Sequence, residues 1–219
     1  MTFQYPLKLI SPSPSAEQKS VLVFLLTYGG GLVGGDQVHL KIDVNPNAKL
    51  SIVTQGHTKI FKSSTREVIT RQKLQVTIED GASVCLLPDP VQPFAGSVYE
   101  QSQTFIIKGG GSLFEKLSTF FLSEFAALPR IGARDFRSDD KKERDNEVIL
   151  SRHESWRLRR LRQEKDEGIL WSAAKVRGCT VVKFGAPTVE SGRVWIGGMI
   201  KEECSISEIF GEDSLMCVR

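Results

Sequence analysis

The sequence predicts a mainly β protein with one or two α-helices, and two observations carry this prediction. Residues 1–108 contain short apolar runs, alternating or continuous, separated by glycine and proline turns, which is typical of strands. After residue 113 the apolar spacing changes to three or four residues, which indicates a helix. The strands do not alternate with helices, so a doubly wound fold is disfavoured.

The clearest strand pattern runs from Val38 to Val44, where Val38, Leu40, Ile42 and Val44 alternate with polar side chains. Val21–Thr27 is a continuous apolar run that fits a strand buried on both faces. Asp80-Gly81 is expected to form a hairpin turn between strands at 68–79 and 83–87. The remaining expected strands are 49–54, 58–62, 103–108, 179–184 and 193–196.

Two helices are expected. Residues 115–128 carry Leu117, Phe120 and Phe125 on one face, and Pro129 ends the helix. Residues 147–165 fit a surface helix with a ragged apolar side that includes Trp156 and Leu158. We expect a single domain over residues 1–219, with a flexible N-terminus at 1–19 and a charged loop or helix insertion at 134–167.

Composition narrows the class of protein. The chain has 219 residues, 40% of them hydrophobic, which is enough for a sizeable core, and its net charge of +3 does not demand nucleic acid or an acidic membrane. The four cysteines form no CxxC pair, which favours a reducing compartment. The longest apolar run is far shorter than the roughly 20 residues of a membrane span. We therefore expect a soluble, cytoplasmic protein.

The first motif is TYGGGLVGGD at residues 27–36, which contains Gly29, Gly30, Gly31, Gly34 and Gly35. Its GxGxxG spacing suggests nucleotide binding, but that function needs a helix next, and the residues after Asp36 have a strand pattern. We favour a tight turn in which glycines adopt positive φ and the backbone packs closely.

The second motif, TQGHTKIFKS, begins with Thr54 and Gln55 and places His57 near Lys59. A lone histidine is usually hydrogen-bonded or exposed, because metal sites need several convergent ligands. Nickel ligation by His57 remains the alternative, since imidazole suits this metal.

The third motif, LPDPVQPF, fixes Asp89 between Pro88 and Pro90 in a stiff loop. An aspartate that caps a structural turn is the favoured interpretation. A carboxylate that binds or passes on an ion is the alternative.

The fourth candidate is the arginine-rich segment at residues 152–165. Acidic residues dilute its charge, so a solvated face is favoured over binding of nucleic acid or another acidic partner. No hydrolase elbow, HExxH motif or paired catalytic Cys and His occurs, which weighs against an enzyme.

Three of these motifs, in order, resemble the amino-terminal half of the urease accessory protein family UreD, also called UreH. They are TYGGGLVGGD, TQGHTKIFKS and LPDPVQPFAGSVYEQ. Segments at residues 120–136, 169–186 and 192–197 resemble the carboxy-terminal third of its eukaryotic-type members.

The resemblance implies a helical β-sheet architecture with a pair of helices and no catalytic turnover. It implies docking on apo-urease together with UreF and the nickel-carrying GTPase UreG, and support of nickel insertion. No cofactor is bound permanently, and nickel passes only transiently. If the sheet encloses a polar lumen, Asp36, His57 and Asp89 are the candidates to line it.

One departure from the family pattern follows Leu113. Family members continue through several more strands before their helix, whereas here Leu113 leads directly into Phe114 and the helical pattern. We interpret the chain as a spliced or wrongly assembled form that lacks a central block. Such a chain is expected to expose strand edges and apolar surface, to fold poorly and to be inactive. A transcript continuous across these two codons would argue against wrong assembly.

Overall fold

The structure is a computed structural model, and it describes residues 4–14, 18–109, 115–128 and 151–218. The chain divides into two compact units. The first, called the β unit here, comprises residues 1–114 and 196–219, and the second, called the helical unit, comprises residues 115–195. Strands outnumber helices overall, which confirms the mainly β prediction.

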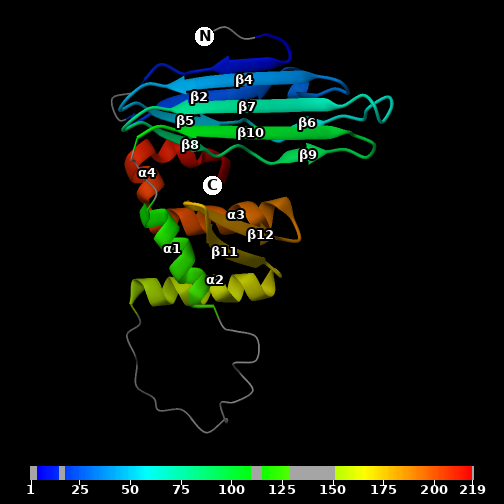
Figure 1. The fold of residues 1–219 in the computed structure, drawn as a ribbon. Coiled ribbons are helices and arrows are strands. Elements are labelled where there is room, and N and C mark those ends of the chain that lie inside the picture. Colours follow the sequence, from blue (N-terminus) through cyan, green and yellow to red (C-terminus); the bar gives the residue numbers. More distant parts are fainter. Residues whose placement is uncertain (1–3, 15–17, 110–114, 129–150, 219) are drawn as a thin grey trace, which may run out of the picture. The chain divides into compact units, whose positions relative to one another are not determined.

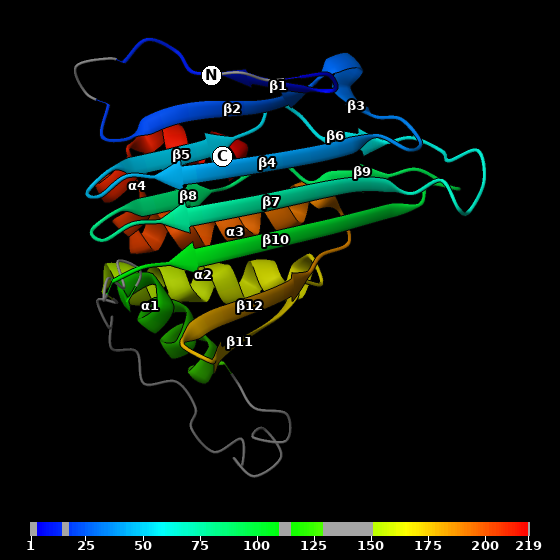
Figure 2. The same ribbon diagram turned by 45° about the horizontal axis from the view of Figure 1, so that its top comes forward.

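The β unit is a parallel β-helix of three coils, in which each coil contributes one strand to each of three sheets (Figure 1). The first coil contains β2 (Val21–Thr27), β3 (Gly31–Leu32) and β4 (Gln37–Val44); the second contains β5 (Lys49–Val53), β6 (Thr58–Ile60) and β7 (Thr70–Ile78); the third contains β8 (Ser83–Leu86), β9 (Val91–Pro93) and β10 (Tyr99–Ile107). Equivalent strands of successive coils pair in parallel, and Figure 2 shows β4, β7 and β10 side by side.

A further strand, β1 (Leu7–Ile10), pairs antiparallel with β2. This strand lies within residues 1–19, where the sequence predicts a flexible N-terminus. The run LKLI is too short to predict a strand by itself, and it becomes one by pairing with the edge of β2. The helical turns η1 (Tyr28–Gly30), α4 (Ser205–Phe210) and η2 (Glu212–Val218) complete the β unit.

The predicted hairpin at Asp80-Gly81 is wrong. The turn is present, with Gly81 at φ 69° and the Ala82 N–H donating to the Glu79 carbonyl at 3.0 Å. However, it connects strands of two different sheets, because β8 pairs with β5 and β7 pairs with β4 and β10. A tight turn with positive φ can connect two paired strands of a hairpin or two strands of different sheets. The local sequence therefore cannot distinguish the two connections.

The core of the β unit lies inside the coils. Along β4, Val38 and Val44 are buried while His39, Lys41 and Asp43 are exposed, as the alternating pattern predicts. Beside a cluster of Leu22, Val53 and Cys217, apolar side chains from successive coils stack in two further clusters. The buried members of these clusters are Leu7, Leu32, Val38 and Ile60 in one, and Val44, Leu74 and Val76 in the other.

The helical unit contains α1 (Glu115–Ala126), α2 (Arg152–Asp166) and the hairpin of β11 (Leu170–Val176) with β12 (Cys179–Gly185). The two expected helices are therefore present. Helix α3 (Val189–Glu203) begins in this unit and ends in the β unit. None of the helices in the described ranges combines the length and apolar character needed to cross a membrane.

The predicted strand at 193–196 is wrong, because these residues lie within α3. The start of this helix is set by Thr188, whose Oγ1 accepts a hydrogen bond from the Ser191 N–H at 3.1 Å. This arrangement is an N-cap, and Glu190 in the first turn also favours a helix. Three β-branched or aromatic residues, Val194, Trp195 and Ile196, are too few to override these signals.

Candidate functional site

The third motif meets the second at one corner of the β-helix. Thr54 follows β5 directly, and Asp89 lies in the loop between β8 and β9. The Thr54 hydroxyl donates to Asp89 Oδ2 at 3.0 Å and accepts from the Asp89 N–H at 2.7 Å. The Gly56 N–H donates to the same carboxylate oxygen at 2.8 Å. Two coils that are adjacent in space are thus joined by polar contacts between buried groups.

A small cavity of about 40 Å³ opens at this corner inside the coils. Its lining combines apolar side chains, such as Leu25, Leu74 and Leu86, with Lys73 and the polar residues Thr54, Asp89, Gln72, Gln101 and Gln103. A cavity must offer roughly 10–15 Å³ to hold one water molecule, so this one has room for a few. The corner therefore combines a carboxylate, hydroxyls and amides around a small space.

Two buried cysteines, Cys85 and Cys217, lie near this corner but do not serve as metal ligands. The Cys217 thiol donates to the Thr54 carbonyl at 3.5 Å. Burial raises the pKa of Cys217, and burial together with the nearby Cys217 charge raises the pKa of Cys85 to about 12. Both groups stay as thiols at neutral pH, and thiols are poor metal ligands. Oxygen ligands are what this corner presents.

The other expected lumen residues lie elsewhere. Asp36 Oδ2 accepts from the Val33 N–H at 2.9 Å, so this carboxylate caps the turn before β4. Gln55, His57 and Lys59 are exposed, and none of them lines the corner cavity. Within the described ranges, no group of three or more His, Cys, Asp or Glu side chains is placed to hold a metal ion.

The glycine motif forms the turns on either side of β3. Gly29, Gly30 and Gly35 have positive φ values of 70°, 74° and 92°. Gly31 and Gly34 instead pack against the second coil: a Cβ on Gly31 would overlap the Lys59 carbonyl oxygen, and one on Gly34 would lie 2.9 Å from Ser63 Cα. The next element is strand β4, where a dinucleotide site requires a helix.

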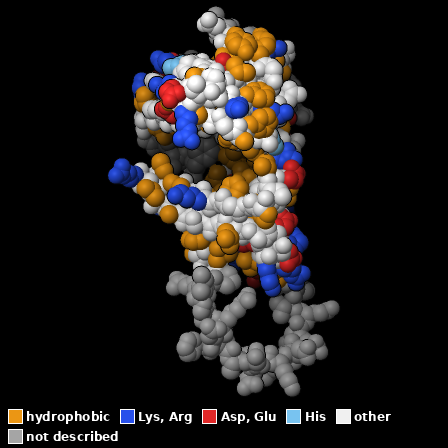
Figure 3. Space-filling model, turned by 90° about the vertical axis from the view of Figure 1, so that its right-hand side faces the viewer, with side chains coloured by type: hydrophobic (Ala, Val, Ile, Leu, Met, Phe, Trp, Pro, Cys, Tyr) orange, Lys and Arg blue, Asp and Glu red, His pale blue; other side chains and the backbone are white. Residues whose placement is uncertain are grey.

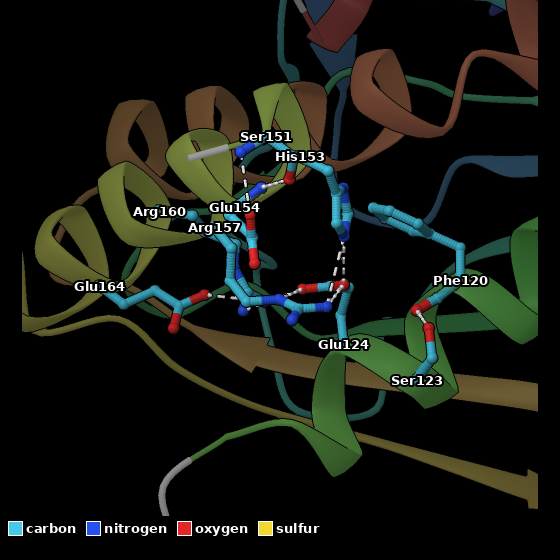
Figure 4. Close-up of polar contacts among 9 residues, drawn as sticks. All are labelled: Phe120, Ser123, Glu124, Ser151, His153, Glu154, Arg157, Arg160 and Glu164. Atoms are coloured by element: carbon cyan, nitrogen blue, oxygen red, sulfur yellow. Dashed lines mark hydrogen bonds and ion pairs between the residues drawn. The ribbon is translucent and has the colours of Figure 1, made fainter. Parts of the chain in front are cut away.

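Sequence reasoning missed a buried charge cluster in the helical unit, shown in Figure 4. Glu124 of α1 is 1% exposed and accepts from Arg157 Nε of α2 at 3.0 Å. Arg160 Nη2 lies 3.2 Å from Glu124 Oε2, and Arg160 also pairs with Glu164. Burial alone would raise the pKa of Glu124, but the hydrogen bonds and charges of the two arginines outweigh it, so the pKa is lowered.

This cluster changes the interpretation of the arginine-rich segment. The inner side of α2 is formed by Arg160 and Glu164, while Leu158, expected on the apolar side, is 42% exposed. Arg160 also lies over the Trp156 and Trp171 rings, at 5.3 and 5.4 Å from their centroids. Arg157 and Arg160 are therefore committed to internal contacts, whereas Arg152, Arg159 and Arg162 are exposed. The signal in the sequence is Glu124 itself, the one acidic residue amid the apolar face of α1.

The outer edge of the third coil carries no further strand among the described residues. β8, β9 and β10 each end their sheet. Phe105 and Ile107 of β10 are 44% and 62% exposed, and Figure 3 shows further hydrophobic side chains at the surface on one side. An edge strand of this kind is able to pair with a strand of another chain.

The described residues thus define a parallel β-helix protein with a polar inner corner, followed by a small helical unit. Residues 1–115 match the family model for the UreD urease accessory protein. The chain belongs to the UreD family. The match ends within two residues of Leu113, where the resemblance to the family pattern breaks off.

Curated relatives agree with this assignment. The chain is 44% identical over 108 residues to an uncharacterized urease accessory protein ureD-like of Schizosaccharomyces pombe, covering 49% of this chain and 37% of that protein. It is 32% identical over 161 residues to urease accessory protein 4 of Cryptococcus neoformans, covering 66% and 49%. It is 37% identical over 108 residues to urease accessory protein UreD of Sorangium cellulosum, covering 49% and 33%. The chain spans between a third and half of the length of these relatives.

Proposed function

We propose that this chain acts in urease maturation, as a non-catalytic cytoplasmic chaperone that binds apo-urease and supports nickel insertion together with UreF and UreG. The observation that carries the proposal is the family match over residues 1–115. These residues contain all three coils of the β-helix. The match therefore covers every coil that the structure describes.

Nickel is the cargo of this reaction, and we propose that it passes the inner corner of the coils. Support comes from the cavity lined by Thr54 and Asp89, whose oxygen donors bind a divalent ion weakly enough to release it. A site with soft thiolates or several histidines would hold nickel too tightly for transfer. Of the three residues expected to line the lumen, Asp36, His57 and Asp89, only Asp89 lines this cavity.

The test of the chaperone role is co-purification of the full chain with apo-urease, UreF and UreG. A tagged chain is expected to retain the other three proteins and to raise urease activity when nickel and bicarbonate are added. A matched control is a full-length family member with the central block present. Retention by the control, without retention by this chain, would contradict the proposal and identify the chain as an inactive member.

A further inference from the structure

Strand β10 presents, along one side, a row of backbone groups that pair with no other strand in the described part of the chain. The Lys108 N–H donates to the Ile78 carbonyl of β7 at 2.9 Å, and the Val98 carbonyl accepts from the Thr70 N–H of β7 at 2.9 Å. Backbone groups along a strand alternate between its two sides. Even-numbered residues therefore bond to β7, and the N–H and C=O groups of Gln101, Gln103, Phe105 and Ile107 point to the open edge.

This edge lacks the usual protection against strand pairing. Natural edge strands carry charges, prolines or bulges in their middle. Between Glu100 and Lys108 the sequence is QSQTFII, without charge, proline or glycine. Such a segment has the character of one that pairs with another chain.

The charges at the two ends of the strand are self-complementary. Glu100 pairs with Arg71 at 3.0 Å and Lys108 pairs with Glu79 at 2.7 Å, and Glu100 and Lys108 are both more than half exposed. In an antiparallel pair of two β10 strands with Thr104 on the two-fold axis, each Glu100 lies opposite the Lys108 of the other copy. Each such contact would join the Arg71–Glu100 pair of one copy to the Lys108–Glu79 pair of the other. The result is a row of alternating charges across β7 and β10 of both copies.

The same register satisfies the backbone. It places Gln101 opposite Ile107 and Gln103 opposite Phe105, which are the residues with groups at the open edge, so each pair exchanges two hydrogen bonds. A shift by two residues keeps these bonds but moves Lys108 opposite Val98 or Ser102. A shift by one residue opposes unlike sides of the strands and loses the bonds.

From this geometry we propose that β10 pairs with β10 of a second copy of this chain, antiparallel and centred on Thr104, to form a two-fold symmetric dimer. A two-fold interface is self-complementary, as this strand is. The inference concerns this chain alone and goes beyond its proposed role with urease.

Cysteine cross-linking tests the register. Thr104 faces its own copy in a non-hydrogen-bonded pair, where the Cα atoms lie about 4.5 Å apart, which is compatible with a disulfide. With the exposed Cys179 and Cys204 first replaced by serine, Thr104→Cys is expected to form a covalent dimer under mild oxidation. Ser102→Cys is the control, since the two Ser102 residues lie roughly 13 Å apart along the strands. Cross-linking of Ser102→Cys as readily as Thr104→Cys, or of neither, overturns the proposal.

Sedimentation of the otherwise unmodified chain tests the dimer itself. A concentration-dependent shift from one to two chains is expected, and Gln103→Pro should weaken it at least tenfold, because proline removes an N–H that faces only the open edge. An unchanged melting temperature shows that the variant is folded. A chain that is monomeric at every concentration, or one that grows into longer polymers, contradicts the proposal, and the cross-linking result decides even where Gln103→Pro does not fold.

Discussion

The Thr54 hydroxyl bonds to both the backbone and the side chain of Asp89, at 2.7 and 3.0 Å, and these two bonds join the second and third coils of the β-helix. Both residues are buried. A buried polar group that loses its partner costs free energy because water cannot replace the bond. The pair therefore couples the stability of the coils to the position of the Asp89 carboxylate.

Thr54→Val removes the hydroxyl with little change of shape and leaves the Asp89 N–H unpaired. The free energy of unfolding should fall by about 1–3 kcal/mol, measured by urea denaturation. Thr58→Val is the matched control: Thr58 lines the same cavity, and its hydroxyl makes no hydrogen bond within the described part of the chain. Equal losses for the two variants would show that the Thr54 bonds do not stabilise the coils.

Asp89→Asn tests the nickel route separately from stability. An amide oxygen still accepts from Thr54 and Gly56, so the melting temperature should stay close to that of the unmodified chain. The lost charge should lower urease activation severalfold in an assay with apo-urease, UreF, UreG and nickel. His57→Ala should leave activation unchanged, since His57 is exposed and away from the cavity. Full activation by Asp89→Asn would remove Asp89 from the route.

Glu124→Gln tests the charge cluster of the helical unit. The substitution leaves Arg157 and the buried Arg160 without their shared anion, so the unit should lose roughly 3 kcal/mol or more. Tryptophan fluorescence reports this loss selectively, because all three tryptophans, Trp156, Trp171 and Trp195, lie in the helical unit. The exposed pair of Glu190 with Arg193 provides the control, and Glu190→Gln should change stability by less than about 1 kcal/mol. A similar small effect of Glu124→Gln would contradict the assignment.

The same cluster predicts a dependence on pH. The pKa of Glu124 is lowered from its ordinary value of 4.5, so the folded state keeps this carboxylate ionised more readily than the unfolded state does. Its stabilising contribution is fully present above pH 4.5 and is lost as the pH falls through the lowered value. The difference in unfolding free energy between the unmodified chain and Glu124→Gln should therefore shrink in acid. A constant difference between pH 7 and pH 3 would be inconsistent with this origin.

Gly197 and Gly198 are neighbours in α3 with opposite surroundings. A Cβ on Gly197 would overlap the Val218 carbonyl oxygen of η2, whereas a Cβ on Gly198 would meet nothing within 4 Å. Gly197→Ala should destabilise the chain by about 1–3 kcal/mol through overpacking. Gly198→Ala should stabilise it by about 0.5–1 kcal/mol, since alanine favours a helix. Thermal unfolding of the two variants compares them directly, and the same sign for both would refute this packing.

The sequence predicts the strands well where side-chain alternation is long, as in β4, because burial imposes a period of two on every such strand. It fails at Asp80-Gly81, where the partner of each strand is set by the coil and not by the turn between them. It fails again at 193–196, where the N-cap at Thr188 lies outside the short segment that suggests a strand. Both errors concern information that is not local to the residues in question.

The candidate site is predicted in part. Asp89 and Thr54 are identified from their motifs, but their contact joins residues 35 positions apart and follows only from the stacking of coils. Asp36 belongs to the first motif and His57 to the second, yet both lie outside the cavity, because a motif marks a family without stating which way a side chain points. Glu124 escapes notice since its partners, Arg157 and Arg160, lie on another helix of a segment that is charged throughout.

The stacking of coils also determines how local stability is distributed along the chain. In such a linear array each repeat touches only its neighbours, so its resistance to opening is a sum of nearest-neighbour terms. The second coil, β5 to β7, has a neighbour on both sides, while β10 has one. In the monomer, amide protons of β7 should therefore exchange with deuterium more slowly than those of the two edge strands, β4 and β10, and opening should begin at an end coil and advance inward.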